Sequence, residues 1–260
     1  MSGGVLEDVK AGPQAGSGRL LDVCAVTKSF GGVQALDSCS FKVAPHRITA
    51  LIGPNGSGKT TIFNCVSGFY RPDAGEVRFG ERRISGLAPS RIVHERLART
   101  FQITRIFKRM SVLENMVVPV RRTGLKAMFW DGIQGHERER AERLLEFVGL
   151  LRFSDEQAGH LSFGQQKLLE LAAALMAEPE ILLLDEPSGG LNPVMIDRLA
   201  GYVVELNQMG TTFLIVEHNM GFVMRLADTV VVMHRGAVIG EGTAAEVRAD
   251  PRVLEAYLGD

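Results

Sequence analysis

The chain has 260 residues, a length that suits one large domain or a core that carries a subdomain. Hydrophobic residues make up 45% and charged residues 23%, ordinary values for a globular protein with a sizeable core. The formal net charge of −1 gives no indication of nucleic-acid binding or of a polybasic attachment to lipid. A chain of this charge that works at a membrane is held there by a protein partner.

Residues 1–19 are rich in Gly and Ser without apolar periodicity, so we expect a disordered tail. The N-terminus lacks the apolar stretch of a secretory signal, and no run approaches the roughly 18–20 apolar residues that span a bilayer. The three cysteines, Cys24, Cys39 and Cys65, form no CxxC pair. Such a sparse, odd set fits a reducing cytoplasm and indicates small buried side chains rather than disulfides or a zinc site.

From Leu20 onward, short β-branched runs alternate with longer amphipathic segments. The opening part predicts antiparallel hairpins at Leu20–Val26, Cys39–Val43 and Glu76–Phe79. Later runs are too short and too apolar for helices, and predict buried strands at Ile48–Ile52, Ile181–Leu184, Thr212–Val216 and Thr229–Met233. Helical patterns lie between them, at Thr60–Ser67, Gln165–Met176, Pro193–Gln208 and Met220–Leu226. This alternation predicts an α/β fold with a mainly parallel sheet covered on both faces.

The middle of the chain has a different pattern. Residues 105–160 contain helical patterns at Val112–Val118 and His136–Val148, and no convincing strand. We therefore expect one domain over residues 20–260, with a helical subdomain inserted at about 103–175.

A glycine-rich loop follows the predicted strand Ile48–Ile52 and precedes a helix, which is the context that a phosphate-binding loop requires. The motif G-x-x-x-x-G-K-[ST] and its neighbour are Gly53, Pro54, Asn55, Gly56, Ser57, Gly58, Lys59, Thr60 and Thr61. Glycines let backbone N–H groups turn inward around phosphate oxygens at the positive end of a helix. Lys59 can reach the β- and γ-phosphates of ATP, and the Thr60 hydroxyl can bind Mg²⁺. The alternative is a glycine-rich turn with an exposed lysine.

Two adjacent carboxylates, Asp185 and Glu186, end the apolar run Ile181–Leu184. Ligands of a parallel sheet bind at the carboxyl ends of its strands, so Asp185 can meet the metal held at Thr60. Glu186 is then placed to orient and polarise the water that attacks the γ-phosphate. Taken alone, an Asp-Glu pair at a strand end is usually just a turn.

The segment Leu161–Lys167, with the sequence LSFGQQK, resembles the LSGGQ signature of ABC ATPases. The resemblance implies the ABC ATPase fold, with an antiparallel β subdomain and an inserted helical subdomain beside the parallel core. It also implies that Ser162, Gly164 and Gln165 close over a nucleotide held by a second ATPase subunit. Phe163 replaces the usual glycine. The alternative for Ser162 is a plain helix N-cap.

Other family elements follow in order, and their roles are implied by the resemblance. Gln102 matches the glutamine that contacts the metal and links the core to the helical subdomain. His218 matches the switch histidine at the γ-phosphate, although a lone histidine is more often structural. Phe30 occupies the position of the aromatic that stacks on adenine, with a core phenylalanine as the alternative. Asn192 stands where the family usually has an aspartate in the loop that crosses to the partner.

Within the family, three stretches resemble the ATP-binding subunits of branched-chain amino-acid importers: residues 98–102, 188–193 and 256–260. Systems for urea, short amides or lipopolysaccharide share much of this pattern. The resemblance implies an ATPase using ATP and Mg²⁺, bound peripherally at the cytoplasmic face of the inner membrane. Its implied partners are two permease subunits, a second ATPase subunit and, indirectly, a solute-binding protein. We expect residues 103–118, with Ile106, Phe107, Met110 and Val112, to line a groove for a permease helix or to be subdomain core.

Three other classes of protein share the phosphate-binding loop. A soluble ABC ATPase of cofactor assembly remains open. A DNA-maintenance type has a long coiled coil and a translation type has two cassettes, whereas this chain has no sustained heptads and a single cassette. A P-loop small-molecule kinase would lack the signature, Gln102 and His218. A non-hydrolysing scaffold has nothing in its favour, because Glu186 and His218 are both present.

Overall fold

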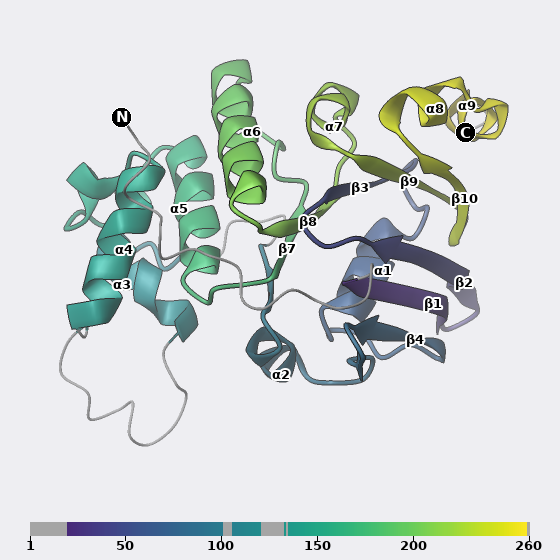
Figure 1. The fold of residues 1–260 in the computed structure, drawn as a ribbon, viewed down its shortest axis with the longest axis horizontal. Helices are drawn as coiled ribbons and strands as arrows, with labels where there is room; N and C mark the ends of the chain where they lie inside the picture. The colour runs from purple at the N-terminus through teal and green to yellow at the C-terminus, as the bar shows by residue number, and fades with distance from the viewer. Residues whose placement is uncertain (1–19, 101–105, 121–132, 134, 259–260) are drawn as a thin grey trace.

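A six-stranded sheet forms the centre of the protein (Figure 1). The computed structural model describes residues 20–100, 106–120, 133 and 135–258. The strand order is β10-β9-β3-β8-β7-β6, with β9 parallel to β3 and β10 antiparallel to β9. The strands are β3 (Ile48–Ile52), β6 (Leu97–Arg99), β7 (Ile181–Asp185), β8 (Thr212–Val216), β9 (Thr229–His234) and β10 (Ala237–Gly242). Every residue of β3, β7 and β8 is buried, because the sheet is covered on both faces.

A second, antiparallel sheet lies beside the first in the order β2-β1-β4-β5. Its strands are β1 (Leu21–Phe30), β2 (Val33–Val43), β4 (Ala74–Phe79) and β5 (Arg82–Arg83). Helix α1 (Lys59–Val66) packs between the two sheets, with Ile62, Phe63 and Val66 in one core with residues of both. This core fixes the helix that follows the glycine-rich loop.

The helical lobe occupies the opposite end of the molecule in Figure 1. Apart from a bridge between Ser111 and Gln157, each element described between β6 and β7 is helical. The elements are α3 (Val112–Val117), α4 (Gly135–Phe147), α5 (Phe163–Leu175) and short 3₁₀ turns at Val118–Val120, Leu151–Phe153 and Ala158–His160. Their apolar faces form one core with β7, β8 and α6 (Pro193–Gln208). The helix that begins at the signature residues therefore shares a core with the central sheet.

The C-terminal helices cover the end of the central sheet near β9 and β10 (Figure 1). They are α7 (Met220–Leu226), α8 (Ala244–Ala249) and α9 (Pro251–Leu258), while the short α2 (Pro89–His94) precedes β6. Val223, Val247 and Val253 pack from α7, α8 and α9 against β3 and β9. The end of the chain is thus part of the core.

The expected α/β fold with a mainly parallel sheet and N-terminal antiparallel hairpins is confirmed. The elements β5, β6, β10, α2, α8 and α9 were not predicted from the sequence, because they are short or lie at a sheet edge. The predicted tail, residues 1–19, lies outside the described residues, and the bounds 103–175 of the helical subdomain stay a prediction. Among the described helices, none is both long and apolar enough to cross a membrane.

Candidate functional site

The candidate residues lie at the carboxyl ends of three neighbouring strands of the central sheet, β3, β8 and β7. Val216, at the end of β8, is paired with Leu51 on β3 and with Asp185 on β7. Just beyond it, the Glu217 N–H donates to the Leu51 carbonyl (3.3 Å), and the Glu186 N–H donates to the Val216 carbonyl (2.9 Å). The glycine-rich loop, the acidic pair and the segment carrying His218 therefore leave the sheet side by side, where ligands of parallel sheets bind.

The glycine-rich loop is packed so closely at Gly53 and Gly58 that no side chain fits at either position. A Cβ added at Gly53 would lie 2.1 Å from the Met233 carbonyl oxygen, and one at Gly58 would lie 2.6 Å from the Ala35 carbonyl oxygen. Gly56 and Gly58 also have positive φ angles of 78° and 100°. The loop delivers the chain to the N-terminus of α1, which starts at Lys59. This is the backbone shape of an anion cradle.

Lys59 lies across this loop. Its Nζ donates to the carbonyls of Gly53 (2.8 Å) and Pro54 (2.7 Å), and to the Ser57 hydroxyl (3.3 Å). Burial lowers the pKa of Lys59, while the negative charge of Glu186 acts in the opposite direction. The electrostatic influence of Glu186 on Lys59 places the candidate phosphate-binding lysine and the candidate general base in one site.

Asp185 is buried and paired with a cation that the sequence analysis had not assigned to the site. Its Oδ2 accepts a hydrogen bond from Arg99 at 2.8 Å, and the Arg99 and Asp185 side chains are only 8% and 5% exposed. The same guanidinium donates to Asn64 Oδ1 (2.6 Å) and Ser67 Oγ (2.7 Å) on and next to α1. Arg99 thus joins β6, α1 and β7, and a metal contact by Asp185 would use Oδ1.

Glu186 and His218 face each other across the site. His218 Nδ1 lies 3.9 Å from Glu186 Oε2, and the histidine is the more exposed of the two. Glu186 has a φ of 46°, which a residue with a side chain adopts at a cost. The structure therefore brings together two residues that are 32 positions apart in the chain, as the family resemblance implies.

A second residue that the sequence analysis did not single out is Glu217, which is fully buried. One of its carboxylate oxygens accepts from the Ser188 N–H (2.8 Å), and the other accepts from the N–H groups of His218 and Asn219 (both 3.0 Å). These three bonds satisfy a buried carboxylate. They also tie the loop after Glu186 to the backbone of His218.

The signature residues begin α5. Ser162 is the N-cap, with its Oγ accepting from the Gln165 N–H (3.3 Å) while Gln165 Oε1 accepts from the Ser162 N–H (2.8 Å). A Cβ at Gly164 would lie 2.9 Å from the Met195 methyl group, so α5 lies directly against α6. Asn192 caps α6 by accepting from the Met195 N–H (2.9 Å). Within this chain, Ser162 therefore acts as the helix N-cap that was the alternative for this residue.

Three further predicted site residues are Phe30, Thr60 and Gln102, and the structure describes the first two. Phe30 is 43% exposed at the end of β1 and meets Tyr70 edge to face, 5.1 Å between ring centroids, so it is not a core residue. Thr60 is exposed on the first turn of α1. Gln102 lies outside the described residues, although the Thr100 N–H still donates to the Leu183 carbonyl (2.9 Å) and continues the line of β6. The exposed ring of Phe30 is available for stacking.

A groove of about 250 Å³ lies between the helical lobe and β6. Ile106 and Phe107 line it, as expected, together with residues of α5 such as Ala173. Val112 does not, because its side chain is fully buried in the lobe, so for Val112 the core alternative is correct. Buried Asn115 fixes the groove wall by accepting from the Phe107 N–H (2.7 Å) and donating to the Phe107 carbonyl (3.1 Å).

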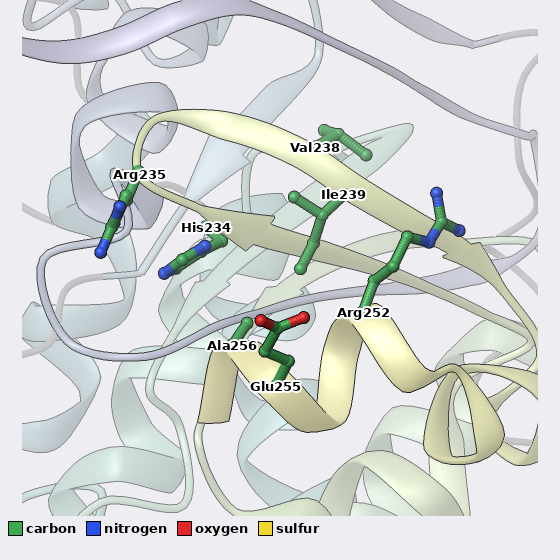
Figure 2. Close-up of a pocket in the computed structure, with 7 residues that line it drawn as sticks. All are labelled: His234, Arg235, Val238, Ile239, Arg252, Glu255 and Ala256. Atoms are coloured by element: carbon green, nitrogen blue, oxygen red, sulfur yellow. The ribbon is translucent and has the colours of Figure 1, made fainter. Parts of the chain in front are cut away.

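The C-terminal helix supports the glycine-rich loop from outside the nucleotide cradle. Val253 of α9 packs in one cluster with Ile52, the residue before Gly53, and burial raises the pKa of Tyr257 on the same helix. Figure 2 shows a cavity of about 610 Å³ between α9 and the β9–β10 hairpin. Its described lining includes no residue of the glycine-rich loop, although Gly236 of the same hairpin donates its N–H to the Ser57 carbonyl (3.0 Å).

The donor set fits a nucleotide with Mg²⁺. The loop offers backbone N–H groups before the N-terminus of α1 and a lysine, and Thr60 and Asp185 offer the oxygen ligands that Mg²⁺ prefers. Among the described residues, no three His, Cys, Asp or Glu side chains gather to hold a metal by themselves. That arrangement suits Mg²⁺, which commonly relies on one or two protein oxygens and on substrate phosphates.

Two family models match the chain. One is described as ABC transporter and matches residues 36–189, which contain the glycine-rich loop, the signature and the acidic pair. The other is described as branched-chain amino acid ATP-binding cassette transporter and matches residues 237–260, which contain β10, α8 and α9.

Similar proteins of known name match almost the whole chain. The high-affinity branched-chain amino acid transport ATP-binding protein LivG of Salmonella typhimurium is 39% identical, over 93% of this chain and 98% of its own length. BraF of Pseudomonas aeruginosa, which has the same descriptive name, is 40% identical with the same coverage. A crystal structure of the ADP conformation of an ATP-binding cassette of an ABC transporter has a TM-score of 0.85 at 36% identity, covering 94% of this chain and 100% of that one.

Proposed function

This chain belongs to the ABC transporter family, and we propose that it is the ATP-hydrolysing subunit of an importer of branched-chain amino acids. The observation that carries the solute class is the separate match of residues 237–260 to a branched-chain amino acid cassette model. The names of LivG and BraF agree with it. The C-terminal segment is integral to the core through Val253, so the match falls on structure rather than on a loose tail.

Nucleotide phosphates bind in the loop from Gly53 to Lys59. The backbone N–H groups and the N-terminus of α1 stabilise the negative charge, and the Lys59 ammonium moves from the loop carbonyls to phosphate oxygens. Phe30 stacks on the base from the end of β1. These contacts hold and orient the γ-phosphate at the edge where β3, β7 and β8 end.

Glu186 is the general base in this proposal. It accepts a proton from water or orients that water toward the γ-phosphate, and His218 holds the γ-phosphate from the opposite side of the site. Thr60, Asp185 and Gln102 would hold Mg²⁺, and the bound ion would supply positive charge to the phosphates. Arg99 holds Asp185 in place because it donates a hydrogen bond to Oδ2 of that carboxylate.

Ser162, Gly164 and Gln165 serve the nucleotide of a second ATPase subunit. They lie at the N-terminus of α5, where a phosphate oxygen of the partner's nucleotide can take the place of the Ser162–Gln165 capping bonds. Each active site is therefore complete only in a dimer of this chain with a copy or a homologue. Hydrolysis removes the contacts to the γ-phosphate and releases the dimer.

The groove lined by Ile106 and Phe107 receives a helix of a permease subunit. Phe107 is exposed at its rim, and the loop that carries it is held by Asn115, so the surface is apolar and preformed. Two permeases hold the ATPase dimer peripherally at the cytoplasmic face of the membrane. A solute-binding protein on the other side selects the amino acid.

Affinity isolation of the intact complex tests this proposal. The full chain with Glu186→Gln carries a tag, membranes are solubilised mildly in the presence of ATP, and partners are identified by mass spectrometry. We expect two polytopic permeases and an ATPase subunit. Recovery of soluble assembly proteins alone would contradict the importer and leave a cytoplasmic ATPase.

A further inference from the structure

Two side chains of α5 point from the signature toward the segment that follows the acidic strand β7. Phe163 and Lys167 are four residues apart, so they share one face of the helix, one turn from each other. Lys167 Nζ lies 5.8 Å from the centroid of the Phe163 ring, within the range of a cation–π contact. The pair connects the signature to residues 186–190 of the same chain.

The ammonium of Lys167 is buried against the backbone of the candidate general base. The residue is only 7% exposed, and its Nζ donates to the Glu186 carbonyl at 3.5 Å. This hydrogen bond is long, but a charge in a low-dielectric site attracts a carbonyl dipole beyond ideal hydrogen-bond distance. Lys167 therefore acts on the peptide that orients the Glu186 side chain.

That peptide has a conformation that needs support. Glu186 has a φ of 46°, in the left-handed region that is unfavourable for a residue with a side chain. Its N–H donates to the Val216 carbonyl (2.9 Å), and its carbonyl accepts from the Gly189 N–H (3.1 Å) as well as from Lys167. The direction of the Glu186 carboxylate thus depends on contacts to its backbone.

Phe163 contacts the next part of the same loop. A Cβ added at Gly190 would lie 2.9 Å from the Phe163 ring, and Gly190 has a φ of 74°. The ring is half exposed beside the signature Ser162, and it packs over the turn that follows Glu186. An aromatic at this position connects the N-terminus of α5 to the loop from Glu186 to Gly190, a contact that a glycine could not make.

We propose that Lys167 is a positioning residue for Glu186, and that Phe163 and Lys167 together transmit movements of the signature to the general base of the same chain. The inference rests on the proposed function, in which Glu186 orients the attacking water and Ser162 binds the partner's nucleotide. Nucleotide binding in one site of the dimer then adjusts the catalytic carboxylate of the other through α5.

A double-mutant cycle tests this role in the intact transporter, isolated through a tag on this chain. The variants are Lys167→Met, Glu186→Gln and the double variant, with the exposed Lys42→Met on β2 as the control for loss of a lysine charge. We expect Lys167→Met to lower kcat by up to about 100-fold, the cost of a misplaced catalytic group, with KM for ATP little changed. In the Glu186→Gln background the same substitution should change the residual rate less than about twofold, because there is no carboxylate left to position.

The other outcomes have distinct meanings. An equal loss from Lys167→Met in both backgrounds would overturn the proposal, because a general structural defect acts whether or not Glu186 is present. Wild-type turnover in Lys167→Met, beside a strong loss in Glu186→Gln, would also overturn it. Full activity in Glu186→Gln would instead contradict the proposed general base.

Two more variants keep the test decisive if Lys167→Met does not fold. Lys167→Arg keeps the cation and should retain more turnover than Lys167→Met or Lys167→Gln. Phe163→Leu keeps an apolar contact but removes the ring, so we expect a smaller decrease in kcat and weaker dependence of one site on nucleotide in the other. A Lys167→Arg variant that folds but has no more turnover than Lys167→Gln contradicts the role of the charge.

Discussion

Removing the guanidinium of Arg99 should destabilise the protein more than any exposed ion pair can. Arg99→Met keeps the length of the side chain but leaves the Asp185 carboxylate buried without its cation, and removes the bonds to Asn64 and Ser67. Breaking a buried pair on one side costs about 3–5 kcal/mol. A typical domain is stable by about 5–15 kcal/mol, so the loss is a large part of the total.

The matched control is an ion pair at the surface. Arg47 and Asp228 lie 3.1 Å apart, but their side chains are 61% and 34% exposed, and Arg47→Met should cost less than about 1 kcal/mol. The double variant Arg99→Met with Asp185→Asn should recover stability relative to Arg99→Met alone, since it removes the uncompensated charge. Arg99→Lys keeps the charge without the planar guanidinium, so its stability should lie between those of Arg47→Met and Arg99→Met.

Urea unfolding of the isolated chain, followed by far-UV circular dichroism, measures these differences as shifts in the midpoint at constant slope. We expect the urea midpoint to decrease in the order wild type, Arg47→Met, Arg99→Lys, Arg99→Met. If Arg99→Met is as stable as Arg47→Met, the pair with Asp185 does not hold β6, α1 and β7 together, and the reasoning from burial is wrong.

Asn115→Ala should lower the free energy of unfolding by about 1–3 kcal/mol, because it leaves the Phe107 backbone without its side-chain partner. Hydrogen exchange at the Phe107 amide should become faster, and unchanged exchange would contradict this. Glu217→Gln replaces one of the two acceptor oxygens with an NH2 donor, so it removes an acceptor from the N–H groups of Ser188 or of His218 and Asn219. It should lower kcat for ATP with little change in nucleotide affinity, and wild-type kcat would count against a positioning role. Burial raises the pKa of Cys39 to about 12 and of Cys65 to about 11. Above about pH 9 the two thiols therefore ionise in the unfolded chain before they ionise in the folded chain, and the free energy of unfolding should fall from about pH 9 to 12. Urea unfolding of a Cys39→Ala, Cys65→Ala variant should show a less steep fall.

Much of the central sheet could be predicted because strands buried on both faces leave a distinct pattern. Ile48–Ile52 and Thr212–Val216 agree with β3 and β8 at both ends. β10 escaped notice because it is an edge strand with two glycines and no fully buried residue. β6 has only three residues, too few for any period to be read.

The candidate site was predictable where a motif is local in sequence, and not where a contact is distant. The glycine-rich loop and the acidic pair follow from short stretches around two strands. Arg99 is 86 residues from Asp185 and Glu217 is 29 residues from Ser188, so only the folded sheet brings each pair together. Lys167 looked like any polar residue of an amphipathic helix, because nothing local indicates that its ammonium meets the Glu186 carbonyl.

Uptake of radiolabelled leucine by cells that lack this chain tests the central claim most directly. Uptake of external leucine should fall on deletion, return with the wild-type chain, and not return with Glu186→Gln expressed at the same level. Uptake that is unchanged by deletion, or fully restored by Glu186→Gln, would contradict the conclusion that this chain drives import of branched-chain amino acids by hydrolysing ATP at Glu186.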